Sequence, residues 1–408
     1  MVNTSPLAVP EHAPQMRTLT IATLLLTVAV LAQGQAPAER PTGRSITGLP
    51  AVNFDADEGF GYGASVQYFD YGFTGASPYR FSLQPTVFFT TKGRRDALLF
   101  VDAPHILPAG WRFGGIAGQQ RQLANPYYGI GNESPLDTNA TKGANPYFYR
   151  YGRTILLASG DLQHAVGFPA LRLLVGAGAR RVTVTPVPYD SGTTLFAQQY
   201  GTALLPARDT RYLRAGLVVD TRDREIGTQS GTWSEVLLQS AGGSLGGDES
   251  YTRITGTIRQ YVPLGPSVIL AERVLMQTVR GSPSTSELSV VQSSFRDDEA
   301  LGGATSVRGL PRNRYAGKGV AFSNTELRWS AAQFELRERS MQLILTAFLD
   351  AGRVWTDGLD FSQIATDLHV GYGGGAHVAV GPSFVVSADV GHSSQSRAAV
   401  YVGLGYLF

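Results

Sequence analysis

The stretch VYVGLGYLF, residues 400–408, alternates between two kinds of side chain along its whole length. One face of an extended chain here carries the large apolar residues Val400, Val402, Leu404, Tyr406 and Phe408. The opposite face carries Tyr401, Gly403, Gly405 and Leu407. Because successive side chains of a β-strand point to opposite faces, the stretch predicts a strand with one large apolar face. This pattern is typical of the wall of a β-barrel.

Two earlier stretches repeat the alternation and add charges to one face. In residues 171–180, apolar side chains alternate with glycine and with Arg172 and Arg180. In residues 211–220, Arg214 lies on the face opposite the leucines. Charges on that face favour a polar lumen over an apolar core. A soluble sandwich would show the same alternation with its polar face in water, so the alternation alone leaves both architectures open.

The composition restricts the class of protein. The chain has 408 residues, a formal net charge of +2, 48 glycines, 10% aromatic residues and no cysteine. An extended nucleic-acid-binding surface needs a larger excess of positive charge, so we expect no nucleic-acid partner. The absence of cysteine excludes disulfides, thiolate metal sites and a thiol nucleophile. These figures suit a large, glycine-rich, ordered β protein.

The N-terminal segment has the layout of a secretory signal peptide. Arg17 precedes a 14-residue apolar run, 19–32. The run ends at Ala32, and Gln33 and the small residue Gly34 follow it, so that small residues stand at both positions that define a cleavage site. The run is too short to cross a bilayer as a helix, which needs about 20 residues. A buried amphipathic helix is the alternative, but the run shows no polar face. We therefore expect residues 1–34 to be a signal peptide.

No later apolar stretch is long enough for a membrane-spanning helix, so membrane embedding would have to use strands, and only a closed barrel satisfies their backbone groups in lipid. Divided at glycine, proline, asparagine and aspartate clusters, the sequence predicts sixteen strands. They are residues 47–55, 59–70, 79–92, 95–104, 111–121, 147–161, 171–185, 209–220, 231–241, 250–263, 267–281, 318–330, 340–354, 366–381, 383–393 and 398–408. The predicted fold is all-β, a 16-stranded antiparallel transmembrane β-barrel over residues 45–408.

The lengths of the connections agree with an even strand number. With both chain ends in the periplasm, the short turns 264–266 and 381–382 fall on the periplasmic side. The long segments 122–146, 186–208 and 282–317 all fall on the outer side. A barrel of this size leaves an aqueous hole unless something fills it. We expect the longest loop, which follows the eleventh strand, to fold inward.

That loop contains GGATSVRGLPRNRYAGKG, residues 302–319, which has no acidic residue. Its four cations are Arg308, Arg312, Arg314 and Lys318. An arginine taken out of water needs an acidic partner. On the next two predicted strands, the alternation places Glu326 and Asp350 on the lumen face. The alternative is an exposed, solvated basic loop with no fixed partner.

An ordered set of motifs resembles one known family. The set consists of Val307-Arg308-Gly309 in the loop, Asn324-Thr325-Glu326-Leu327, Phe348-Leu349-Asp350-Ala351-Gly352 and the terminal Phe408. It resembles the BamA/TamA outer-membrane assembly-factor superfamily, also called bacterial surface antigens. Pieces similar to its short members are Gly48-Leu49-Pro50, Tyr128-Gly129-Ile130-Gly131-Asn132 and Asp220-Thr221-Arg222-Asp223. The resemblance spans the whole predicted barrel.

The resemblance implies that Arg308 enters the lumen as a loop latch against Glu326 and Asp350. Val307 and Gly309 complete the loop motif. A planar guanidinium can bridge two carboxylates through charge-assisted hydrogen bonds, so the physical argument agrees with this role.

The resemblance also implies the cell outer membrane as the location. Tyr406 and Phe408 would act as the assembly signal through which the barrel-assembly machinery folds this protein by its C-terminal strand. About a dozen residues separate the leader from the first strand, which is too few for a folded domain. We therefore expect a short form without periplasmic domains.

The implied function is to aid the insertion of polypeptides into the outer membrane or their passage across it. A weak seam between the first and last strands would let an incoming strand pair with an exposed edge. The expected partners are outer-membrane lipid and an unfolded polypeptide client. One alternative is a passive, anion-preferring pore lined by Arg172, Arg180, Arg214, Arg253 and Arg259. Another is a surface-binding structural barrel that acts through the loops 122–146 and 186–208.

The sequence gives little reason to expect an enzyme, a cofactor or a metal site. None of the six histidines has metal-ligand spacing such as HExxH. His369 and His377 share strand parity, and His392 precedes two serines, so a barrel hydrolase is a minor alternative. The glycines of 371–375 lie on a predicted strand with no helix after it, which excludes dinucleotide-binding and phosphate-binding loops.

Overall fold

The computed structural model describes residues 42–408, except 56–58, 74, 77, 108–109, 144, 191, 226, 337–338 and 381–383. The chain divides into two compact units, Met1–Pro37 and Ala38–Phe408, and every described residue lies in the second unit. The predicted signal peptide, residues 1–34, lies outside the described residues.

The second unit is built on one antiparallel sheet of sixteen strands, in which each strand pairs with the next along the chain. The strands are β1 (Gly43–Asp55), β2 (Gly59–Gly72), β3 (Phe81–Thr90), β4 (Arg94–Ala103), β5 (Trp111–Pro126), β6 (Arg150–Val166), β7 (Phe168–Thr185), β8 (Arg208–Asp220), β9 (Gly231–Ala241), β10 (Ser250–Pro263), β11 (Val268–Ser282), β14 (Gly319–Leu336), β15 (Arg339–Trp355), β16 (His369–Val380), β17 (Phe384–Ser393) and β18 (Ala399–Leu404). The predicted strand number, order and antiparallel pairing are confirmed.

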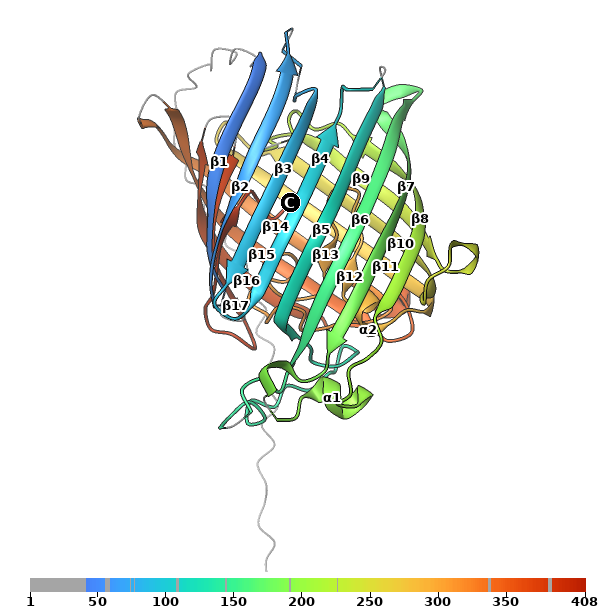
Figure 1. Cartoon of the computed structure of the whole chain (residues 1–408). Helices are drawn as coiled ribbons and strands as arrows, with labels where there is room; N and C mark the ends of the chain where they lie inside the picture. Colours follow the sequence, from blue (N-terminus) through green and yellow to red (C-terminus); the bar gives the residue numbers. More distant parts are fainter. Residues whose placement is uncertain are drawn as a thin grey trace, which may run out of the picture. The chain divides into compact units, whose positions relative to one another are not determined.

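The sheet curves until β1 comes into contact with β18 (Figure 1). Because consecutive strands are antiparallel, their connections alternate between the two ends of the sheet. The connections 127–149, 186–207 and 283–318 lie at one end, which we call the long-loop end. The opposite end, the short-turn end, carries the connections 221–230 and 264–267.

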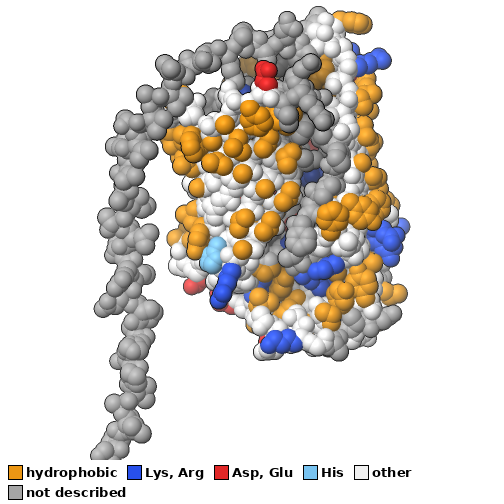
Figure 2. All heavy atoms as spheres, turned by 90° about the vertical axis from the view of Figure 1, so that its left-hand side faces the viewer, with side chains coloured by type: hydrophobic (Ala, Val, Ile, Leu, Met, Phe, Trp, Pro, Cys, Tyr) orange, Lys and Arg blue, Asp and Glu red, His pale blue; other side chains and the backbone are white. Residues whose placement is uncertain are grey.

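The two faces of the sheet differ in the way that the alternation predicts. Apolar side chains on the outer face are exposed; examples are Leu213, Leu217, Val236, Ile254 and Ile258. Polar and charged side chains on the inner face are buried; examples are Arg214, Glu235, Arg253, Thr255 and Arg273. Figure 2 shows hydrophobic side chains spread over the outer surface of the strands. Exposed apolar area of this extent is unusual for a soluble monomer and suits a lipid environment.

The end of β18 differs from the prediction. The strand stops at Leu404, and Gly405 then turns the chain with a left-handed φ of 91°. Tyr406 and Phe408 do not share the outer face with Val400. Their rings instead lie 4.1 and 5.3 Å from the guanidinium carbon of Arg328 on the inner face. A glycine permits this turn, and the attraction between a cation and an aromatic ring favours it.

The remaining elements are short and lie in the connections. They are the helices η1 (Pro188–Asp190), α1 (Leu195–Tyr200), η2 (Gly243–Leu245), α2 (Thr285–Leu288) and η3 (Phe361–Gln363), and the strands β12 (Val290–Val291) and β13 (Asp298–Glu299). Thr194 is the N-cap of helix α1, and its side chain accepts a hydrogen bond from the N–H of Ala197. In the described part of the chain, none of the helices has the length and apolar character that crossing a membrane requires.

Candidate functional site

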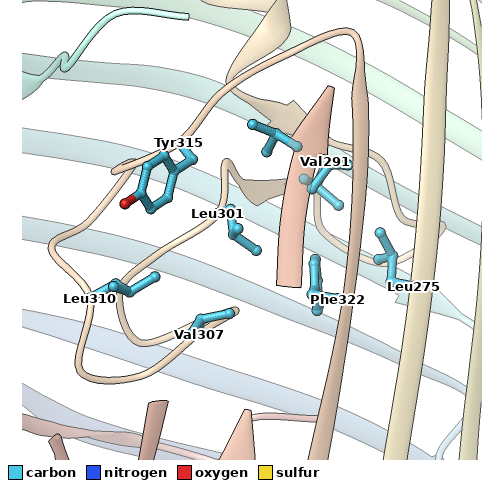
Figure 3. Close-up of a cluster of buried hydrophobic side chains, with 9 residues drawn as sticks. Leu275, Val291, Leu301, Val307, Leu310, Tyr315 and Phe322 are labelled. Atoms are coloured by element: carbon cyan, nitrogen blue, oxygen red, sulfur yellow. The ribbon is translucent and has the colours of Figure 1, made fainter. Parts of the chain in front are cut away.

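The long loop 283–318 packs on the inner face of β11, β14 and β15 through a cluster of buried apolar side chains (Figure 3). The loop contributes Val291, Leu301, Val307, Leu310 and Tyr315, and the strands contribute Leu275, Val320, Phe322 and Val354. Each of these side chains is at most 4% exposed. Burial of this apolar area holds the loop against the strands independently of its charges.

Arg308 at the loop tip lies between two carboxylates. Its Nε and Nη2 donate hydrogen bonds of 2.8 and 3.0 Å to Asp350, and its Nη1 donates one of 2.8 Å to Glu326. The main-chain N–H of Arg308 also donates to Asp350, over 3.0 Å. The three side chains are at most 1% exposed. The structure thus brings the three residues of the predicted latch into direct contact.

The charges around Arg308 form a wider network. Glu326 also accepts a 2.7 Å hydrogen bond from Nε of Arg328, and Asp350 accepts one of 2.8 Å from the amide of Asn324. Burial lowers the pKa of Arg308, but the hydrogen bonds and charges of Asp350 and Glu326 outweigh this and raise it above its ordinary value. Arg308 therefore stays charged, and removing one partner would leave a buried charge unpaired.

Glycines on β16 and β17 let the backbone of the loop tip approach the sheet. A Cβ atom at Gly371 would overlap the carbonyl oxygen of Arg308. A Cβ atom at Gly391 would lie 2.7 Å from the nitrogen of Gly309. Gly309 itself has a φ of 96°, a conformation that residues other than glycine rarely adopt. The glycine-rich start of β16 therefore contributes part of the surface on which the tip lies.

The tip also contacts the last strands of the sheet. The N–H of Gly309 donates to the hydroxyl of Tyr401 on β18 over 2.9 Å. The hydroxyl of Ser393 on β17 donates to the carbonyl of Gly309 over 2.7 Å. Asp389 on β17 lies 3.8 Å from Nη1 of Arg308. None of these three contacts was predicted from the sequence, although the alternation of Val386, Ala388 and Val390 places Asp389 on the inner face.

Three of the five arginines that were expected to line an anion pore have acidic partners. Arg214 forms a buried ion pair with Asp161. Arg180 and Arg253 lie 3.9 and 3.2 Å from Glu287, which belongs to α2 in the long loop. Arg180 also lies 3.5 Å from Asp297 of the same loop. At these three positions, the charges of the arginines are therefore balanced by Asp161, Glu287 and Asp297.

The connection 127–149, between β5 and β6, contacts the long loop at the long-loop end of the sheet. The N–H of Gly131 donates to the carbonyl of Ala316 over 2.9 Å. The side chain of Asn132 accepts from the N–H of Val354 over 3.0 Å and donates to the carbonyl of Asp367 over 2.9 Å. The connection 127–149 thus reaches from β5 and β6 to β15 and β16. The stretch Tyr128–Asn132, noted in the sequence as a motif, provides these contacts.

The histidines have ordinary partners. His377 lies 3.0 Å from Asp389 and His369 lies 3.1 Å from the carbonyl of Asn132. Within the described ranges of residues 42–408, no group of three or more histidine, aspartate or glutamate side chains is arranged to hold a metal ion.

The chain matches one protein family and has a fold similar to those of several solved structures. The family model for the Omp85 superfamily domain matches residues 81–397. None of the curated proteins matches the sequence. Among solved structures, the fold is similar to that of BamA from Haemophilus ducreyi lacking POTRA domains 1–3, with 14% identity, a TM-score of 0.56, and coverage of 90% of this chain and 70% of that one. It is also similar to CdiB from Escherichia coli, with 13% identity, a TM-score of 0.57, and coverage of 92% of this chain and 63% of that one.

Proposed function

Because the chain belongs to the Omp85 superfamily, whose members are β-barrel proteins of the outer membrane, we propose that it aids the insertion of polypeptides into the outer membrane or their passage across it. The carrying observation is the buried contact of Arg308 with Glu326 and Asp350. A loop tip held by one buried cation between two carboxylates can be released by breaking that contact.

The seam between β1 and β18 supports the same function. β1 is 13 residues long and β18 is 6 residues long. In the described part of the sheet, the ladders run from β1 to β18 without a ladder between these two strands. An edge of this kind offers backbone hydrogen-bonding groups to an incoming strand, and an extended polypeptide can add to it.

The passive anion pore is less well supported. Arg180, Arg214 and Arg253 are all engaged by carboxylates, so their charges are compensated before any solute arrives. A surface-binding barrel is a separate candidate. The connection 127–149, which we call the cap, is held at the long-loop end by hydrogen bonds to the long loop and to β15.

The test is a client-insertion assay with the protein in liposomes. The natural chain has no cysteine, so a cysteine pair that joins β1 to β18 can lock the seam without side reactions. The oxidised pair should stop the insertion of an unfolded outer-membrane barrel polypeptide, and reduction should restore it. A matched pair at Leu238 and Ile254, which are opposite each other on β9 and β10, should have no effect. Equal insertion by the oxidised and reduced seam variants would contradict the proposal.

A further inference from the structure

The connection between β8 and β9 is long for the short-turn end. It has ten residues, 221–230, whereas β6 and β7 are joined by Gly167 alone. It lies at the opposite end of the barrel from the loop 283–318, since successive connections alternate between the ends. We call its described residues, 221–225 and 227–230, the gate turn.

The gate turn is internally structured. Oδ1 of Asp223 accepts hydrogen bonds from the N–H groups of Gln229 and Ser230, over 2.9 and 3.1 Å. At its base, Asp220 accepts two hydrogen bonds of 2.8 Å from Arg222. Gly231 has a φ of 101°, and a Cβ atom there would overlap the carbonyl oxygen of Thr221. Because the two bonds of Asp223 lie within the connection, the outer part of the turn can move without losing them.

A single arginine joins the gate turn to a distant part of the wall. Arg112 on β5 donates from Nη1 and Nη2 to the two carboxylate oxygens of Glu225, over 2.7 and 2.9 Å. The same guanidinium donates from Nε and Nη2 to Asp102 on β4, over 2.8 and 2.6 Å. The hydroxyl of Tyr79 donates to Asp102 over 2.7 Å. Arg112 is thus held between one carboxylate of the wall and one of the turn.

The two carboxylates have different roles in this contact. The side chain of Arg112 is 7% exposed, while those of Asp102 and Glu225 are 23% and 24% exposed. Without Glu225, Arg112 keeps both hydrogen bonds to Asp102, so neither of these two wall residues is left without a partner. Without Arg112, two carboxylates would face each other unpaired, which is far more costly. Glu225 is therefore the group whose loss frees the turn with least damage to the barrel.

The gate turn also forms one wall of a cavity of about 480 Å³. Other parts of its lining come from distant strands, namely Phe69 of β2, Arg328 of β14, Val385 of β17, and Tyr406. The turn therefore extends over the interior towards the side where the latch lies. The ring of Phe295, from the long loop, lies 5.6 Å from the guanidinium carbon of Arg112, so the loop and the turn meet at this arginine.

We propose that the gate turn is a second barrier across the barrel, at the end that we expect to face the periplasm, and that the contact of Glu225 with Arg112 holds it closed. The interior is then closed twice in series, by the loop 283–318 and by the gate turn. This inference concerns the path through the barrel and does not depend on the identity of a client or on insertion activity.

The first test is single-channel conductance in a planar bilayer with Arg308→Ala, Glu225→Gln and the double variant. Because each single variant leaves one of two barriers in series in place, both should pass at most a small, flickering current. The double variant should conduct at least about threefold more than the sum of the two, because barriers in series are not additive. Asp357→Asn, an exposed acid at the long-loop end, should match the wild type. A double variant no different from Arg308→Ala would overturn the proposal.

The second test follows the turn directly. Thr228 is 5% exposed and its hydroxyl donates to the carbonyl of Arg224. In the cysteine-free chain, Thr228→Cys should react slowly with a polar thiol reagent. Adding Glu225→Gln should accelerate the labelling about tenfold or more, because labelling follows local opening of the turn. Arg112→Lys keeps the charge but cannot fork to two carboxylates, so it should accelerate labelling to a smaller extent. Unchanged labelling in both backgrounds would show that the contact does not hold the turn.

Discussion

Asp350 accepts hydrogen bonds from both the main-chain N–H and the side chain of Arg308, over 3.0 and 2.8 Å to the same oxygen. One carboxylate on β15 therefore fixes the position of the loop backbone as well as the direction of the guanidinium. The side chains of both residues are at most 1% exposed.

Arg308→Ala should release the loop tip while the barrel persists. Breaking a buried charge pair costs about 3–5 kcal/mol, because Glu326 and Asp350 are left without their cation. We expect protease cleavage within 283–318 and a raised single-channel conductance, with the folded barrel still visible by its heat-modifiable gel migration. Arg181→Ala, which removes an exposed arginine with 61% side-chain exposure, is the control. A loop that stays protected in Arg308→Ala would refute the latch.

Gly371→Ala should displace the loop tip without changing any charge. The added methyl group would overlap the carbonyl oxygen of Arg308, so the tip and β16 cannot keep their present spacing. The same protease assay should show cleavage of the loop. Gly256→Ala on β10 is the matched control, because nothing lies within 4 Å of a Cβ atom there. Equal protection of the two variants would mean that the close approach is not needed to hold the tip.

The contribution of Glu287 and Glu299 to holding the long loop should be lost only in the acid range. Burial raises the pKa of Glu287, but the nearby Arg180 and Arg253 outweigh this and lower it from 4.5 to about 2. Burial likewise opposes the effect of Arg312 on Glu299, whose pKa is also lowered to about 2. A lowered folded-state pKa means that the stabilisation is complete above about pH 4.5 and is lost as the pH falls towards 2. Protease protection of the loop should decline as the pH falls below about 4.5. Protection that persists unchanged down to pH 2 would contradict this assignment.

Asn132→Ala should loosen the connection 127–149. The substitution removes the acceptor of the Val354 N–H and the donor to the carbonyl of Asp367. Leaving a buried N–H unpaired costs about 1–3 kcal/mol. Surface protease added to intact cells should then cleave this connection faster, whereas the exposed Thr138→Ala in the same connection should behave as wild type. Unchanged cleavage in Asn132→Ala would show that other contacts hold the cap.

Local patterns were sufficient to predict the sheet. Apolar alternation, such as that of residues 211–220, reports which side chains face out, because a strand places successive residues on opposite faces. Glycine and proline clusters mark where strands end. These two rules predicted the number and order of strands and placed Glu326 and Asp350 on the inner face. They overextended the last strand, because alternation continues through Gly405 while the backbone turns there.

The contacts between connections and walls were decided only by the tertiary structure. Arg112 and Glu225 are 113 residues apart in the chain, and Asn132 and Val354 are 222 apart. Gly371 and Gly256 are both glycines on strands, but of the two only Gly371 lies in close contact with the backbone of another segment, at Arg308. A strand's alternation depends on its own residues alone, whereas the partner of a buried charge depends on which distant connection reaches it. The sequence by itself therefore determined the strands and their two faces, and the tertiary structure decided which connections contact the inner face and through which residues.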